Sequence, residues 1–139
     1  MPPKDSLLDA VDTTVSDPLT EANSLGDRAA SVGFDWEFAL EALEKVEEEA
    51  EELREVLEAH DPDPSKVLSE IGDLLFAACM VARKSGVDPV EALGATNAKF
   101  RARFAFIERE LAREGVDPND ATLEEMEALW QASKQHMSR

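Results

Sequence analysis

The sequence lacks tyrosine, contains a single cysteine, and has no stretch in which apolar and polar residues alternate long enough to form a strand. Cys79 therefore cannot form an internal disulfide, and with only two histidines in the chain it makes a poor zinc site. No apolar run approaches the roughly 20 residues that a membrane-spanning helix needs. These absences favour an all-α protein with no zinc centre and no membrane span.

Basic residues are also scarce. Lysine and arginine total 14 against 31 aspartates and glutamates, which gives the 139-residue chain a formal net charge of −17. Such a charge argues against a protein that binds nucleic acid through its phosphates. The 43% of apolar residues suffices for one folded core. The first residues include acids where a signal peptide would carry basic and then apolar residues, so we expect a cytoplasmic protein.

Helix-boundary signals divide the first half of the chain. Residues 1–16 have no helical apolar stripe and are predicted to be a disordered leader, followed by one helical domain over residues 17–139. Asp17 and Pro18 form an N-cap with a first-turn proline, which predicts a short helix ending near Gly33. A long acidic helix is expected to open at residues 34–36, with Asp35 as its cap, and to end at the proline-containing loop 60–64.

Three further helices are expected at about residues 65–84, from residue 88 to residue 115, and after the capping box Thr122–Glu125. The first of these is apolar almost all round between residues 74 and 82, which is typical of a helix in the middle of a bundle. The second should turn an apolar inner face to the core: Leu93, Phe100, Phe104, Ile107 and Leu111. Short loops favour antiparallel neighbours, so the predicted fold is an all-α helical bundle.

Ten glutamates lie between residues 37 and 58, and most of them are expected on a solvated face. Three overlapping E-E-x-x-E patterns occur there, so the pattern alone has little weight. Helical geometry directs Glu55 away from the apolar stripe. The two edges of the stripe carry different acids, and periodicity does not choose between them: Glu49 and Glu52, with Glu48 just beyond, or Glu47 and Glu51.

A second acidic pair lies on the most apolar helix, where Glu70 and Asp73 are three residues apart on one face. Buried carboxylates without partners cost several kcal/mol, and like charges raise each other's pKa. A bound hard cation, shared with acids from a packed neighbouring helix, would resolve this cost. In the alternative interpretation, both acids lie at the rim of the bundle and bond to neighbouring groups.

Two basic residues, Lys99 and Arg103, share a helix face four residues apart, and Trp130 and Lys134 repeat that spacing in the last helix. Each could simply pair with nearby acids or fill the end of the bundle. Together with a carboxylate-bound cation, however, cations and an aromatic plane suit a polyphosphate that carries a base. This combination favours metal-assisted phosphoanhydride hydrolysis.

Several ordered motifs resemble the MazG nucleoside triphosphate pyrophosphohydrolases over roughly residues 19–134. The most specific are the acidic motifs E-E-x-x-E and E-x-x-D, which are separated by 17 residues. The chain has one such domain and is similar to the catalytic C-terminal copy of two-domain relatives. The matching motifs are Gly33-Phe34-Asp35-Trp36, Lys45-Val46-x-Glu48-Glu49-x-x-Glu52, Glu70-Ile71-Gly72-Asp73-Leu74-Leu75-Phe76, Asn97-x-Lys99-Phe100, Arg103-Phe104, Glu127-x-x-Trp130 and Lys134.

The resemblance implies an all-α fold whose four-helix core is completed across the interface of a homodimer or homotetramer. It implies that Mg²⁺, with Mn²⁺ as a substitute, is held by Glu49, Glu52, Glu70 and Asp73. Glu48 would assist a second metal or orient the attacking water, which makes Glu48, Glu49 and Glu52 the implied catalytic residues. Lys99 and Arg103 would bind phosphates, and Trp130 with Lys134 would complete the nucleotide pocket.

The implied reaction is attack of water at the α-phosphorus of a nucleoside triphosphate, giving a monophosphate and pyrophosphate. Ordinary, deoxy or damaged nucleotides are candidate substrates, which would make the protein a cleaner of the nucleotide pool. One alternative is a related pyrophosphatase restricted to dUTP or phosphoribosyl-ATP. Another is a non-catalytic acidic adaptor that dimerises through its apolar helix; in that case magnesium should not change its stability.

Overall fold

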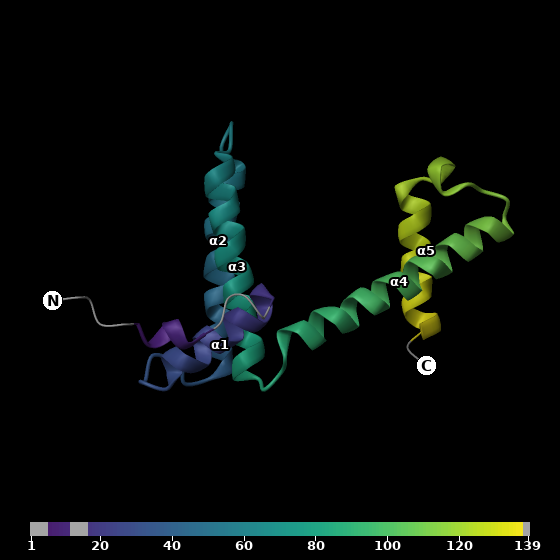
Figure 1. Cartoon of the computed structure of the whole chain (residues 1–139). Helices are drawn as coiled ribbons and strands as arrows, with labels where there is room; N and C mark the ends of the chain where they lie inside the picture. The colour runs from purple at the N-terminus through teal and green to yellow at the C-terminus, as the bar shows by residue number, and fades with distance from the viewer. Residues whose placement is uncertain (1–5, 12–16, 138–139) are drawn as a thin grey trace. The chain divides into compact units, whose positions relative to one another are not determined.

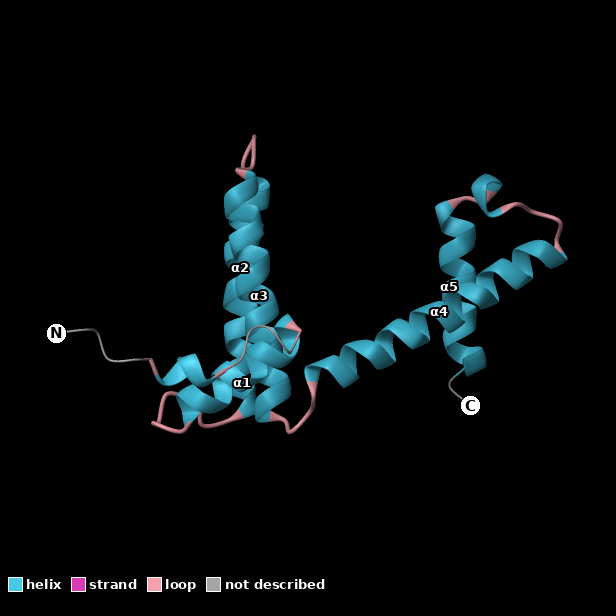
Figure 2. Cartoon of the chain, in the orientation of Figure 1, coloured by secondary structure: helices cyan, strands magenta, loops and turns pink. Residues whose placement is uncertain are grey.

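A computed structural model describes residues 6–11 and 17–137. Within these ranges the chain forms five α-helices and two short 3-10 helices, and it contains no strand (Figure 2). The predicted all-α class is confirmed. Of the predicted leader, residues 1–5 and 12–16 lie outside the described residues, whereas η1 (Leu7–Ala10) is a 3-10 helix. None of the described helices combines the length and apolar character needed to cross a bilayer.

The chain divides into two compact units, residues 1–92 and residues 93–139. In the first unit, α2 (Ala39–Glu58) and α3 (Pro64–Lys84) lie side by side (Figure 1). The short loop between them makes the pair antiparallel. The helix α1 (Pro18–Ala30) packs against α3, and its contact surrounds a small core of Ala22, Cys79 and Met80.

Local capping fixes where these helices begin. The Asp17 carboxylate accepts hydrogen bonds from the backbone N–H groups of Leu19 and Thr20, at 2.9 and 3.0 Å, and Pro18 follows at the first helical position. Asp63 likewise accepts the Ser65 N–H at 2.9 Å before α3. Both caps satisfy donors that a helix N-terminus leaves unpaired. The predicted cap at Asp17 is confirmed.

Asp35 does not cap α2, so that prediction is wrong. The helix begins four residues later, where the Phe38 N–H donates to the Glu41 carboxylate at 3.0 Å. Asp35 instead pairs with Arg83 and Lys84 at the C-terminal end of α3, with Lys84 Nζ 3.1 Å from Oδ2. The Asp35 carboxylate therefore forms long-range ion pairs instead of the helix cap that the local sequence predicts.

Gly26 allows α1 and α3 to approach closely. A Cβ atom at this position would lie 2.6 Å from Arg83 Nε and 2.7 Å from Met80 Sδ. These distances are shorter than van der Waals contact, so a methyl group would displace both side chains. The cost of a glycine inside a helix is thus offset by a closer fit between the two helices.

The second unit contains most of α4 (Pro89–Arg113), η2 (Pro118–Asp120) and α5 (Leu123–Met137). The Glu125 N–H donates to Thr122 Oγ1 at 3.1 Å, which confirms the predicted start of the final helix. Phe100 meets Trp130 with ring centroids 5.3 Å apart. Of the predicted inner face of α4, only Ile107 and Leu111 are buried, because α5 leaves Leu93, Phe100 and Phe104 exposed over more than a third of their surface.

Candidate active site

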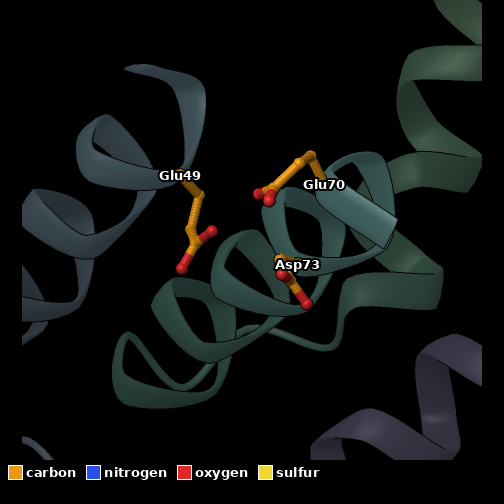
Figure 3. Close-up of side chains that lie close together, drawn as sticks. All are labelled: Glu49, Glu70 and Asp73. Carbon is orange, nitrogen blue, oxygen red and sulfur yellow. The ribbon is translucent and has the colours of Figure 1, made fainter. Parts of the chain in front are cut away.

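Three carboxylates converge between α2 and α3 in the first unit. Glu49 projects from α2 towards Glu70 and Asp73 on α3 (Figure 3). One oxygen of each lies within 4.8 Å of the others. The spacing of Glu70 and Asp73 puts them on one helix face, and the antiparallel hairpin brings Glu49 opposite that face. The predicted pairing of acids from two packed helices is therefore present in the structure.

Burial makes this cluster unusual for acidic groups. Glu49 is only 7% exposed, although most glutamates of α2 are exposed. Glu49 Oε2 and Glu70 Oε2 are both buried, and neither has a hydrogen-bond partner among residues 6–11 and 17–137. Buried anionic oxygens without partners are costly, and a divalent cation with oxygen ligands would satisfy both. The residues present therefore fit a hard metal ion.

Glu52 lies one turn from Glu49 on α2, beside the cluster. Its pKa is raised above the usual range by a hydrogen bond with the Glu49 carboxyl and by the negative charge of that group, with Glu70 adding repulsion. A raised pKa is the expected response of an acid crowded by other acids. Glu52 is thus electrostatically part of the site, although its side chain is exposed.

Lys45 also belongs to the site, and its role was not predicted from the sequence. Its Nζ lies 3.2 Å from Glu49 Oε1 and 3.4 Å from Glu48 Oε2. The two carboxylates raise the pKa of Lys45 through these hydrogen bonds, that of Glu49 first. The i,i+4 spacing of Lys45 and Glu49 was the signal that could have identified the pair. Glu48 is bonded to Lys45 at the exposed edge of α2 and lies outside the three-carboxylate cluster.

The structure also decides which edge of α2 faces α3. Glu47, Glu51 and Glu55 are exposed, and Glu51 pairs with Arg54 at 3.4 Å on the helix surface. The alternative that periodicity left open, with Glu47 and Glu51 at the apolar edge, does not bring either acid to the cluster. Helical spacing defined two edges, and the packing of α2 against α3 distinguishes them.

The second unit brings together part of the predicted basic and aromatic group. The Arg103 guanidinium lies 5.4 Å from the ring centroid of Trp130, a cation–π contact. Arg103 Nε is buried and makes no hydrogen bond within the described residues. Lys99 and Lys134 lie on the exposed surfaces of α4 and α5. The Trp130 ring of α5 thus contacts both Arg103 and Phe100 of α4.

Comparisons with known proteins place this arrangement in a family. A family described as phosphoribosyl-ATP pyrophosphohydrolase matches residues 27–100, which include all three clustered carboxylates. The chain belongs to this family, within the MazG-like superfamily. It is 38% identical over 116 residues to a nucleoside triphosphate pyrophosphohydrolase of Escherichia coli. It is 34% identical over 116 residues to the nucleoside triphosphate pyrophosphohydrolase/pyrophosphatase MazG of Thermotoga maritima.

Both of those matches cover 84% of this MazG-like chain but only 44% of the relative. The chain therefore spans less than half the length of these curated relatives. A shorter match, 45% identical over 74 residues, links the MazG-like domain to 15% of the uncharacterized protein YabN of Bacillus subtilis. The resemblance inferred from the acidic motifs is confirmed at the level of the family.

Proposed function

We propose that the protein hydrolyses nucleoside triphosphates, in the presence of a divalent metal, to nucleoside monophosphate and pyrophosphate. The main support for the proposal is that the carboxylates of Glu49, Glu70 and Asp73 lie close together. Among the described residues, one buried oxygen of Glu49 and one of Glu70 have no hydrogen-bond partner. Membership of a pyrophosphohydrolase family supports the same chemistry. The curated names of the relatives in Escherichia coli and Thermotoga maritima support nucleoside triphosphates as the substrate class.

Mg²⁺ is the proposed ion, with Mn²⁺ as a substitute, because three or four carboxylates form a site for a hard cation. Glu49, Glu70 and Asp73 would hold it, with Glu52 as a further ligand from the next turn of α2. A bound divalent ion would screen the phosphate charge and activate water. Glu48, held by Lys45 at the edge of the cluster, would orient the water or assist a second metal.

Substrate phosphates would be bound by Lys99 and Arg103, and Trp130 with Lys134 would complete the nucleotide site. A protein of charge −17 repels a polyphosphate unless cations offset that charge. Arg103 has a buried Nε–H without a hydrogen-bond partner and lies against the Trp130 ring, which supports a role in binding an anion with an attached base.

A homodimer or homotetramer is proposed as the working assembly. The sequence places α3 in the middle of a bundle, yet in the single chain Leu68 is 76% exposed and Leu75 is 55% exposed. On α2, Leu40 is 73% exposed. Exposed apolar faces of this kind are typical of a core completed by a partner, and a second copy of α2 and α3 would supply four helices. A cytoplasmic location, where free nucleotides occur, is part of the same proposal.

The deciding experiment measures pyrophosphate release from a panel of ordinary, deoxy and damaged nucleoside triphosphates, with MgCl₂ and with EDTA. We expect pyrophosphate and monophosphate in equal amounts, and only with the metal. The panel includes dUTP and phosphoribosyl-ATP, because the matching family is described by the latter substrate. A preference for dUTP or for phosphoribosyl-ATP would show that the substrate is that compound and not nucleoside triphosphates in general.

A thermal-stability titration separates an enzyme from a non-catalytic adaptor. A ligand that binds only the folded state stabilises it, by about 2.7 kcal/mol at a hundred times its Kd. We therefore expect Tm to rise with MgCl₂ concentration at constant ionic strength. Equal Tm with and without Mg²⁺, together with no turnover on the whole panel, would favour the adaptor.

A further inference from the structure

One wall of a pocket in the first unit comes from a segment that precedes the first α-helix. The pocket has a volume of about 500 Å³ and lies between α1, residues 33–36 and α3, where Trp36 and Met80 line it. Leu8 of η1 lines the same pocket. Small-molecule sites span about 300–1,000 Å³, so the space behind Leu8 is large enough for a small molecule.

Few interactions attach η1 to the rest of the first unit. It lies beside α1, in purple in Figure 1, and none of its residues is buried. Leu7 is 38% exposed and Leu8 is 39% exposed. Among the residues that the structure describes, a single hydrogen bond joins η1 to another element: Arg28 Nε donates to the Leu7 carbonyl oxygen at 3.3 Å. An exposed hydrogen bond contributes little to stability, so η1 can detach while α1, α2 and α3 stay packed.

Hydrogen bonds inside the segment preserve its own turn. The Ser6 N–H donates to Asp9 Oδ2 at 2.9 Å, and the Leu8 N–H donates to Ser6 Oγ at 3.1 Å. The Val11 N–H donates to the Leu8 carbonyl oxygen at 3.0 Å. All of these bonds lie within residues 6–11 and do not depend on contact with α1. We therefore expect η1 to move as one piece, so that the Leu8 side chain leaves the pocket when the bond to Arg28 breaks.

Trp36 reports whether the pocket is covered. Its side chain is half-buried and lines the pocket together with Leu8. The Trp36 ring also packs against the small core between α1 and α3, which detachment of η1 leaves in place. Greater access of solvent to Trp36 in a protein that keeps its helices therefore measures the loss of the cover, and not unfolding of the first unit.

We propose that η1 is a detachable cover of this pocket. Leu8 closes the pocket, and release of the bond between Arg28 and Leu7 opens it. The covered and open states are in equilibrium, and any change that removes the bond shifts the population towards the open state. The cover then sets how fast small molecules enter and leave the pocket. The proposal concerns access alone, so it holds for any small molecule that enters and does not rest on the proposed hydrolysis.

The first test measures quenching of Trp36 fluorescence by acrylamide. It uses the Trp130→Phe background, in which Trp36 is the one remaining tryptophan. Arg28→Ala should raise the Stern–Volmer constant about twofold or more, because loss of the bond to η1 increases the open population. Arg54→Ala is the matched control, since Arg54 is an exposed arginine of α2 that does not line this pocket. It should leave the constant unchanged.

The second test compares two neighbouring leucines in the same background. Leu8→Ala removes the side chain that covers the pocket and should raise the Stern–Volmer constant of Trp36 about as much as Arg28→Ala. Leu7→Ala is the matched control, because Leu7 is equally exposed but does not line the pocket. Its backbone carbonyl still accepts the bond from Arg28, so the constant should change little. Leu8→Ala also serves if Arg28→Ala fails to fold.

The third test closes the cover covalently. Leu7→Cys and Arg28→Cys are combined in the Trp130→Phe background, and a short bismaleimide joins the two introduced thiols. The native Cys79 is buried and should not compete for the reagent. Before cross-linking, this protein should be quenched as strongly as Arg28→Ala. After cross-linking, the constant should fall to that of the background or below it, because η1 can no longer leave the pocket.

Circular dichroism of each variant establishes that the helices are retained. Equal quenching in folded Arg28→Ala and Arg54→Ala would overturn the proposal, and so would a cross-link that leaves the constant unchanged. An increase in Leu7→Ala as large as that in Leu8→Ala would contradict the role of Leu8 as the covering side chain. Greater quenching in Arg28→Ala and Leu8→Ala that the cross-link reverses would support the cover.

Discussion

Nζ of Lys45 lies 3.2 Å from Oε1 of Glu49, one helical turn further along α2. One oxygen of the buried carboxylate is therefore bonded to the ammonium group of Lys45, while the other, Oε2, has no partner in the part of the chain that the structure describes. The arrangement orients Glu49 with its free oxygen available to the cluster. Lys45 thus partly offsets the repulsion among the three acids, and it leaves the second oxygen of Glu49 for the proposed metal ion.

Replacing Lys45 by methionine tests this relationship. Lys45→Met keeps the aliphatic chain and removes the charge, so Glu49 would face Glu70 and Asp73 without a cation. We expect the Tm in metal-free buffer to fall by a few degrees, and the rise of Tm with MgCl₂ to be larger than in the unmodified protein. Lys45→Arg is the control, since it keeps the charge. Equal metal responses in all three proteins would contradict the role given to Lys45.

Substitutions in the acidic helices test the choice of metal ligands. Glu49→Gln and Asp73→Asn should each reduce turnover about a hundredfold or more, because the outer partners of metal ligands alone account for 10–100-fold effects. Both variants should remain helical by circular dichroism, and Mg²⁺ should no longer raise their Tm.

Glu47→Gln and Glu55→Gln are matched controls on the exposed surface of α2. They remove one negative charge each and should change turnover little. Turnover losses in these controls as large as those in Glu49→Gln would show that net charge, and not the cluster, governs the reaction.

The pairing of Asp35 with Arg83 and Lys84 predicts a pH-dependent contribution to stability. Burial disfavours the charged form of Asp35, but the hydrogen bonds from Arg83 and Lys84 outweigh it and lower the pKa of the carboxyl. Because the pKa of Asp35 is lower in the folded protein than in the unfolded chain, the unfolded chain binds more protons at acidic pH. The free energy of unfolding therefore rises with pH in that range. Asp35→Asn should cost about 1 kcal/mol at pH 7, because solvent screens an ion pair whose aspartate is exposed.

Urea denaturation at several pH values measures this contribution. The difference between the unmodified protein and Asp35→Asn should be complete at neutral pH and should shrink below about pH 4, as Asp35 takes up a proton. Asp61→Asn, in the exposed loop between α2 and α3, is the control and should leave the unfolding free energy unchanged at pH 7. A difference that stays constant down to pH 3 would exclude the ion pair as its source.

Lys99 is expected to act on phosphates and not on the metal. Lys99→Ala should weaken binding of a nucleoside triphosphate about tenfold, the scale of one charge-assisted hydrogen bond. The Tm shift caused by MgCl₂ alone should not change. Arg101→Ala removes a charge two residues away, on a different face of α4, and should have a smaller effect. Equal weakening of Mg²⁺ and triphosphate binding in Lys99→Ala would contradict its assignment.

Local chemistry predicts the helix starts well. At Asp17, Asp88 and Thr122 the cap and the groups it satisfies lie within three residues of each other, so the sequence contains the whole interaction. Asp35 was misassigned for the opposite reason. Its partners, Arg83 and Lys84, are nearly fifty residues away, and a charged pair between distant segments outweighs a cap that sequence proximity alone suggests.

In the acidic site, too, spacing within one helix could be predicted from the sequence, whereas contacts between helices could not. The spacing of Glu70 and Asp73 already predicts a shared face, whereas the choice of Glu49 over Glu47 needs the orientation of α2 against α3. The family resemblance named the edge that contains Glu49, and this edge faces α3 in the structure. The pocket of about 500 Å³ that Trp36 and Met80 line could not be located from the sequence, since η1, α1, residues 33–36 and α3 form it together.

Cys79, the single cysteine of the chain, is buried against α1. Loss of contact with water raises the pKa of its thiol, and the charge of Asp17 adds to the effect, so little reactive thiolate is present at neutral pH. Maleimide reagents should therefore react very slowly with Cys79 and modify only cysteines introduced at exposed positions. A spin label or dye can be attached to either unit in this background without first removing Cys79, which leaves the α1–α3 core intact in every labelled protein.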